Sequence, residues 1–238
     1  MYRIKHSELG EIVVKPNVRA KNVIARPKSG YIELTIPEGL SHDRILESLE
    51  RMKPRLLKAP RQAEHLISET TSFQTFTFEA CIKKYEIPNQ FRMTLRNGML
   101  TVFVPENVDI LSVRSQNTIK NLIEQALRHE AKRILPTKTE QLAQKFKLTY
   151  RRVFIKKLKS KWGSCSSDKN INLSLYLMLL DEKMIEYVIL HELAHTVHLN
   201  HSAEFWKLLS QFCGENAQGL RDQLKCNLPE SYRYFFSR

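Results

Sequence analysis

The chain of 238 residues contains little of what marks a membrane or secreted protein. Its longest apolar run without a charge is residues 171–180, a stretch that includes an asparagine and a serine. A membrane-spanning helix needs about 20 apolar residues, so this run is too short. Residues 1–8 hold no apolar stretch of the length found in a signal peptide. We therefore expect a cytoplasmic protein with no membrane partner.

Cysteine is also scarce. The four cysteines lie far apart and form no CxxC pair: Cys81, Cys165, Cys213 and Cys226. This spacing excludes a zinc site built from clustered thiolates, and a disulfide framework in a secreted protein of this size would normally use more cysteines. We expect four reduced thiols.

Acidic residues are outnumbered, since 38 lysines and arginines face 25 aspartates and glutamates and give a net charge of +13. The excess is greatest in residues 128–161, which hold twelve basic residues against Glu130 and Glu140 and carry a net charge of +10. A field of this sign attracts nucleic acid, nucleotides or acidic partners. A solvated basic surface without a partner would have the same composition.

Two segments resemble each other and align without a gap, namely 29–38 (SGYIELTIPE) and 97–106 (NGMLTVFVPE). Each has a glycine turn, an alternating apolar run and a proline near its end, which is typical of the second strand of a β-hairpin. The first strands are expected at 23–26 and 91–95, and residues 73–78 alternate as a further strand. Apolar residues at helical spacing follow each hairpin, with Pro136 closing the second helix.

Residues 137–146 predict a short helix, 153–158 a strand, 162–167 a tight turn and 170–175 a second strand. Asp181 is a helix N-cap for a helix over 182–198, and Ser202 caps another helix that ends at Gly214. The expected fold is α+β, with β-hairpin/helix units in residues 1–136. A mostly helical, zincin-like catalytic region with a short β-hairpin then fills residues 137–238.

The predicted helix over 182–198 carries the motif HExxH as His191, Glu192 and His195. Residues four apart lie one turn apart on the same face, so both imidazoles can bind one metal ion with the glutamate beside it. A catalytic zinc usually has a third protein ligand. His198 lies in the same straight row, which cannot surround an ion, and His201 follows the end of the helix. We therefore predict a Zn2+ site formed by His191, His195 and His201.

Three motifs together, residues 162–165 (WGSC), 191–195 (HELAH) and 200–206 (NHSAEFW), resemble the YgjP-like family of zinc metallopeptidases. That family is similar to SprT-like and WLM proteases, which act on proteins attached to DNA. The resemblance implies the same three zinc ligands and a catalytic Glu192. It also implies that residues 162–165 lie beside the active-site cleft.

The favoured function is therefore a metallopeptidase in which Glu192 activates a zinc-bound water to attack the carbonyl of a peptide or protein substrate. A metal-dependent nucleotide or phosphate-ester hydrolase stays open, as does a nucleic-acid-associated protein with a structural zinc. The segment 170–175 is the candidate sheet edge for an extended peptide, and a buried structural hairpin is the alternative for the same segment. Tyr176, Tyr187 and His198 are alternatives for stabilising the oxyanion. The candidate substrate-binding residues are Trp162, Gly163, Ser164, Cys165, Asn172 and Tyr176.

Overall fold

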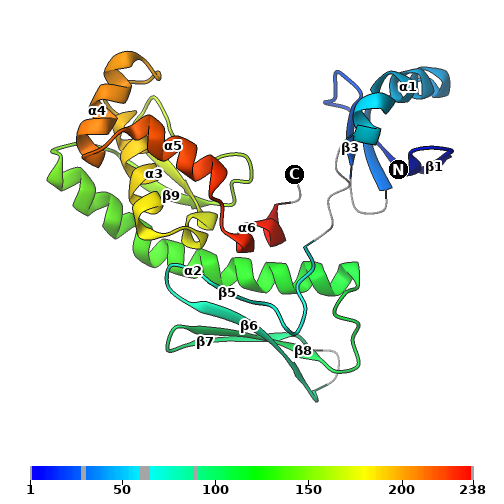
Figure 1. Cartoon of the computed structure of the whole chain (residues 1–238), viewed down its shortest axis with the longest axis horizontal. Coiled ribbons are helices and arrows are strands. Elements are labelled where there is room, and N and C mark those ends of the chain that lie inside the picture. Colours follow the sequence, from blue (N-terminus) through cyan, green and yellow to red (C-terminus); the bar gives the residue numbers. More distant parts are fainter. Residues whose placement is uncertain (1, 28–30, 59–64, 88–89, 237–238) are drawn as a thin grey trace. The chain divides into compact units, whose positions relative to one another are not determined.

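Helices and strands follow one another in the computed structural model as expected for an α+β protein, which confirms the predicted fold class (Figure 1). The structure describes residues 2–27, 31–58, 65–87 and 90–236. The described residues up to His65 form one compact unit, and Leu66–Phe236 form the other. The expected division between residues 136 and 137 lies inside a helix of the second unit.

The first unit is a mixed four-stranded sheet with one helix. Its strands run in the order β1-β2-β4-β3, and Ile12, Leu34 and Leu49 are fully buried in its core. The apolar residues alternate along β4 as the sequence predicts. The elements are β1 (Tyr2–His6), β2 (Gly10–Asn17), β3 (Ile24–Pro27), β4 (Tyr31–Pro37) and α1 (His42–Lys58).

The second unit begins with the same arrangement. Its first sheet has the order β5-β6-β8-β7, and a long helix follows the last strand as α1 follows β4. The elements are β5 (Ser72–Gln74), β6 (Glu79–Tyr85), β7 (Arg92–Arg96), β8 (Met99–Pro105) and α2 (Val113–Lys145).

Strand register shows that the similarity between the two segments is a repeat of structure. In the parallel pair β2 and β4, Glu11 faces Tyr31, and in the parallel pair β6 and β8, Glu79 faces Met99. The number of residues from Glu11 to Glu79 equals the number from Tyr31 to Met99. It also equals the offset at which the two similar segments align in the sequence. The predicted hairpins β3–β4 and β7–β8 are thus correct, and the second turns at Asn97 and Gly98, both with positive φ. The corresponding turn of the first hairpin, at residues 28–30, lies outside the described residues.

Two predictions in the second unit are wrong in part. The strand expected at 73–78 is confined to β5, and a strand that the sequence did not predict, β6, follows it. The helix expected to close at Pro136 continues to Lys145, so the short helix at 137–146 is its last part. A proline inside a helix loses one hydrogen bond, but Leu135, Thr139 and Ala143 are buried on either side and keep α2 continuous.

The remaining elements build the region around HExxH. The strand expected at 153–158 is β9, but the middle of the tight turn expected at 162–167 forms strand β10. The expected hairpin of β9 with β11 is also wrong, because β9 and β11 are parallel and the hairpin is β10–β11. The elements are β9 (Arg152–Lys156), β10 (Gly163–Cys165), β11 (Asn170–Ser174), the 3₁₀ helix η1 (Leu175–Leu179), α3 (Glu182–Ala194), α4 (Ala203–Cys213), α5 (Ala217–Cys226) and α6 (Glu230–Phe235).

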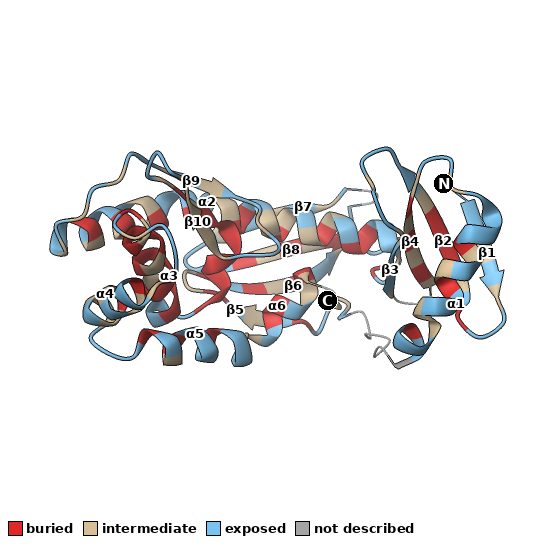
Figure 2. Cartoon of the chain, turned by 90° about the horizontal axis from the view of Figure 1, so that it is seen from above, coloured by how far each residue is buried: buried red, intermediate tan, exposed pale blue. Residues whose placement is uncertain are grey.

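Helix α2 organises the second unit. It contacts β7 and β8 of the first sheet as well as α3, η1 and β9, so it lies between the sheet and the HExxH region (Figure 1). Buried residues concentrate along α3 and on parts of α2 (Figure 2). The site helix is therefore held in a continuous apolar core. In the described part of the chain, no helix combines the length and apolar character needed to cross a bilayer.

Candidate metal centre and active site

Helix α3 presents the two histidines of HExxH. Its N-terminus is capped by Asp181, whose carboxylate accepts a hydrogen bond of 2.8 Å from the backbone amide of Met184. The helix ends at Ala194 with His195 as its C-cap, earlier than the predicted end at 198. His198 therefore does not continue the helical row of His191 and His195.

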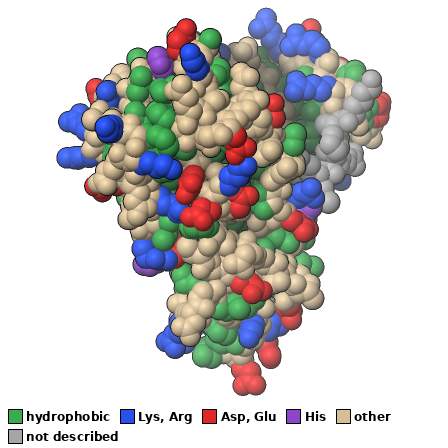
Figure 3. Space-filling model, turned by 60° about the vertical axis from the view of Figure 1, so that its left-hand side comes forward, with side chains coloured by type: hydrophobic (Ala, Val, Ile, Leu, Met, Phe, Trp, Pro, Cys, Tyr) green, Lys and Arg blue, Asp and Glu red, His purple; other side chains and the backbone are tan. Residues whose placement is uncertain are grey.

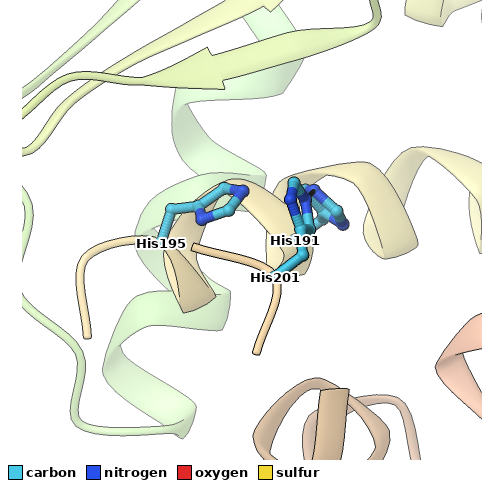
Figure 4. Close-up of side chains that lie close together, drawn as sticks. All are labelled: His191, His195 and His201. Carbon is cyan, nitrogen blue, oxygen red and sulfur yellow. Dashed lines mark hydrogen bonds between the residues drawn. The ribbon is translucent and has the colours of Figure 1, made fainter. Parts of the chain in front are cut away.

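The chain turns after α3 and brings a third histidine back to the first two. His201 comes immediately before Ser202, the N-cap of α4. One ligand atom from each of His191, His195 and His201 lies within 4.8 Å of the others. Nε2 of His201 is 3.0 Å from Nε2 of His191. The three side chains thus converge from one helix and the segment after it (Figure 4).

His198 contributes its backbone rather than its ring. Nδ1 of His195 lies 3.0 Å from the carbonyl oxygen of His198. Because a carbonyl oxygen only accepts, Nδ1 carries the hydrogen and Nε2 keeps a free lone pair for a metal ion. His198 lies outside the three-histidine cluster.

The environment favours the neutral form of His191 and His195, the form in which an imidazole binds a metal. Burial lowers the pKa of His191 to about 3, helped by repulsion from His195, His201 and Arg221. Burial also lowers the pKa of His195. Three imidazole nitrogen donors fit the preference of zinc for imidazole.

Two aromatic residues of α4 hold the histidine rings in place. Phe205 stacks on His195 with ring centroids 4.5 Å apart, and Trp206 stacks on His201 with centroids 5.6 Å apart. Their spacing from Ser202 explains why NHSAEFW acts as a unit: the serine begins the helix, and its first turn delivers both rings.

Glu192 is buried beside the histidines. Its side chain is only 5% exposed, and Oε2 has no hydrogen-bond partner among the described residues. Burial raises its pKa to about 8, while Lys161 and the backbone amide of Cys165 act in the opposite direction. A buried carboxylate with a free oxygen next to metal ligands has the position of a general base.

Strand β10 lies directly against Glu192. A Cβ atom on Gly163 would be 2.6 Å from Oε1 of Glu192, so any larger residue at this position would have to displace the Glu192 side chain. In the three-stranded sheet β10-β11-β9, β10 is an edge strand and β11 is central. The expectation that 170–175 forms the free edge is therefore wrong, because β11 is hydrogen-bonded on both sides.

A cavity of about 690 Å³ opens beside His191, Glu192 and His201. Of the six candidate substrate-binding residues, Trp162 and Gly163 line it. Sequence reasoning missed Lys161 on the same wall and three residues of α5, since no motif marks that helix. The lining residues are Ser160, Lys161, Trp162, Gly163, Tyr187, Val188, His191, Glu192, His201, Trp206, Arg221, Leu224 and Lys225.

The other four candidates, Ser164 among them, are not lining residues. Tyr176 is fully buried, and its hydroxyl donates a 2.6 Å hydrogen bond to Glu124, so its side chain has a packing role instead. Asn172 Nδ2 donates across the β10–β11 pair to the Ser164 carbonyl at 3.3 Å. Burial raises the pKa of Cys165, which disfavours a nucleophilic thiolate.

Of the oxyanion alternatives, Tyr187 lines the cavity, whereas Tyr176 and His198 do not. The Tyr187 hydroxyl is buried without a hydrogen-bond partner among the described residues, and burial raises its pKa. It therefore remains a hydrogen-bond donor at neutral pH.

The basic segment is less uniformly positive in the structure than in the sequence. Arg133 binds Glu130, Lys138 binds Glu182 and Glu186, and Lys157 binds Glu124, as shown by their ion pairs. Basic and acidic side chains are interspersed on one face of the molecule (Figure 3).

The family model for the YgjP-like metallopeptidase domain matches residues 21–227, which include every site residue described above. The chain belongs to the YgjP-like metallopeptidase family. Its members are hydrolases, and the predicted relationship is confirmed. The match begins inside the first compact unit and runs through α5, so the YgjP-like domain includes most of the structural repeat.

Two solved structures are similar to parts of this YgjP-like chain. The metallopeptidase zymogen abylysin of Pyrococcus abyssi is 26% identical over 39% of this chain and 95% of its own, with a TM-score of 0.34. The metallopeptidase zymogen jannalysin of Methanocaldococcus jannaschii is 23% identical over 40% of this chain and 97% of its own, with a TM-score of 0.36. No curated protein gives a match.

Proposed function

We propose that the protein is a zinc peptidase with His191, His195 and His201 as metal ligands and Glu192 as general base. The observation that carries the proposal is the convergence of three imidazoles beside a buried carboxyl group. Zinc, when bound, supplies a Lewis acid that polarises a carbonyl and makes water more acidic. A purely structural zinc site would have no use for Glu192.

Glu192 takes a proton from the attacking water and passes it to the amine that leaves. Its free Oε2 is available for the water, while the backbone amide of Cys165 orients the carboxylate. The nearby cation Lys161 favours the charged carboxylate and offsets part of the effect of burial. No covalent step is needed, so the Cys165 thiol has no chemical role.

The substrate peptide is proposed to extend along β10. The edge of this strand is free in the described sheet, and its first residue, Gly163, touches Glu192. An extended peptide added to that edge would receive backbone hydrogen bonds and carry its carbonyl past Glu192. Trp162, immediately before β10, would then pack against a substrate side chain.

The experiment that tests this function is a screen of the zinc-loaded protein against a peptide library and a panel of nucleotides and phosphate esters. Peptide cleavage that stops on removal of the metal is expected. Hydrolysis of phosphate esters without peptide cleavage would instead support the alternative, in which basic residues hold the phosphates.

A second function is favoured by the exposed side of β9. Arg152 and Lys156 are exposed on either side of Phe154, which is 41% exposed, and Lys156 Nζ lies 5.7 Å from the Phe154 ring. Cations beside an exposed ring suit single-stranded nucleic acid, since phosphates bind the cations and bases stack on the ring. We propose β9 as the part of the basic segment that attracts nucleic acid.

A further inference from the structure

Positive charge surrounds the cavity next to the three histidines. Lys161 lies on the β10 side, and Arg221 and Lys225 lie four residues apart on one face of α5. Among the described residues that line the cavity, the only acidic one is Glu192, which is buried. Lys225 has Asp222 as a distant neighbour at 3.9 Å, outside the lining. The entrance to the reaction centre is thus cationic.

Arg221 is held in position by an aromatic side chain of the site. Its guanidinium carbon lies 5.6 Å from the centre of the Trp206 ring, and Trp206 in turn stacks on His201. A guanidinium that stacks on an indole ring can still donate hydrogen bonds from its N–H groups. Trp206 therefore contacts both Arg221 and His201, one of the proposed metal ligands.

The cations come from two elements that border the same cavity. Arg221 and Lys225 belong to α5, and Lys161 comes two residues before β10. An anionic group that enters the cavity therefore meets cations from both elements.

We infer that Arg221, supported by Lys225 and Lys161, binds a carboxylate of the peptide substrate. The inference rests on the proposed peptidase function and deepens it by naming the substrate class. A guanidinium donates two parallel hydrogen bonds to a carboxylate, and the side chains of Trp162 and Trp206 line the same cavity. The carboxylate comes either from an acidic side chain or from the C-terminus of a short peptide.

The test measures binding rather than turnover, with Glu192→Gln protein to prevent cleavage. Both tryptophans of the chain, Trp162 and Trp206, line the cavity, so quenching of intrinsic fluorescence reports occupancy. Four forms of one peptide are titrated: glutamate or glutamine at one position, each with a free or an amidated C-terminus. The titrations are repeated with Arg221→Gln and with Lys207→Gln, which removes an exposed charge of α4 outside the lining.

A charged form should bind about tenfold more tightly than its neutral counterpart, as is typical of a charge-assisted hydrogen bond. The pair of peptides that shows the difference identifies the source of the carboxylate. Arg221→Gln should abolish the preference, and Lys207→Gln should keep it.

Equal binding of all four peptides, no binding of any, or a preference that survives Arg221→Gln would overturn the inference. Failure of this inference can be distinguished from failure of the proposed peptidase function. Wild-type protein that cleaves neutral and acidic peptides equally is a peptidase without carboxylate recognition. Wild-type protein that binds acidic peptides selectively but cleaves none has the recognition without the activity.

Discussion

Gly163 and Glu192 are packed so closely that a single added carbon on Gly163 would lie 2.6 Å from the Glu192 carboxylate. The glycine of WGSC and the glutamate of HExxH, which are distant in the sequence, are therefore parts of one site. The backbone amide of Cys165 completes this contact by donating toward Glu192. Strand β10 positions the proposed base as well as offering its edge to a substrate.

Gly163→Ala should displace the Glu192 side chain. We expect a loss of about 1–3 kcal/mol in the free energy of unfolding. Peptidase activity should fall by about 100-fold, since a small misplacement of a catalytic group is costly. Chemical denaturation and kinetics measure the two effects. Gly219→Ala is the matched control, because its Cβ would meet its nearest neighbour at an ordinary 3.8 Å. Full activity in Gly163→Ala would show that the close contact is dispensable.

The third metal ligand is tested by comparing two histidines. Purified protein should hold about one zinc per chain. His201→Ala should lose most of it, because one of three convergent donors is removed. His198→Ala should keep it, because the bond to Nδ1 of His195 uses the backbone carbonyl. Metal analysis after dialysis decides, and the reverse pattern would make the ligand assignment wrong.

Cys165→Ala should keep most of the peptidase activity. The backbone amide that faces Glu192 is unchanged by this substitution, and the thiol has a raised pKa and no proposed chemistry. Steady-state kinetics with a cleaved peptide provide the measurement. Loss of activity together with an unchanged zinc content would point to a role of the thiol itself.

Nucleic acid binding by β9 should depend strongly on salt. Affinity for single-stranded DNA should fall log-linearly with salt concentration, as phosphate contacts release counterions. Replacing Arg152 and Lys156 with glutamine should weaken binding and flatten the slope. Lys132 and Lys147, two exposed residues of the basic segment outside β9, provide a control of equal charge. Fluorescence anisotropy at several salt concentrations measures both, and equal effects of the two pairs would reduce β9 to part of a general basic surface.

Local signals explain what the sequence could predict. Asp181 and Ser202 cap the N-termini of α3 and α4 with their side chains, and Gly214 ends α4 in a left-handed conformation. All three helix ends lie where they were expected. The spacing within HExxH determines that two rings share a face. The repeat of the hairpin segments was visible because matching registers impose matching patterns of apolar residues.

The missed features depend on contacts between distant segments. Pro136 predicts a helix end, but buried neighbours on both sides keep α2 intact. Whether β11 is central or at an edge depends on β9, which joins it from a distant segment. Arg221 comes well after His201 in the chain and reaches the cavity only because α5 packs against α3 and α4. No local pattern contains that information.

The role proposed for Glu192 is that of the general base in a zinc peptidase. Its most direct test is the cleavage rate of a peptide substrate by wild-type and Glu192→Gln proteins with equal zinc content, with Glu230→Gln as a control on the exposed start of α6. We expect that Glu192→Gln keeps the metal and the fold but is slower by a factor of about 100 to 10,000, while Glu230→Gln matches the wild type. A zinc-loaded Glu192→Gln protein that cleaves peptides at the wild-type rate would contradict it.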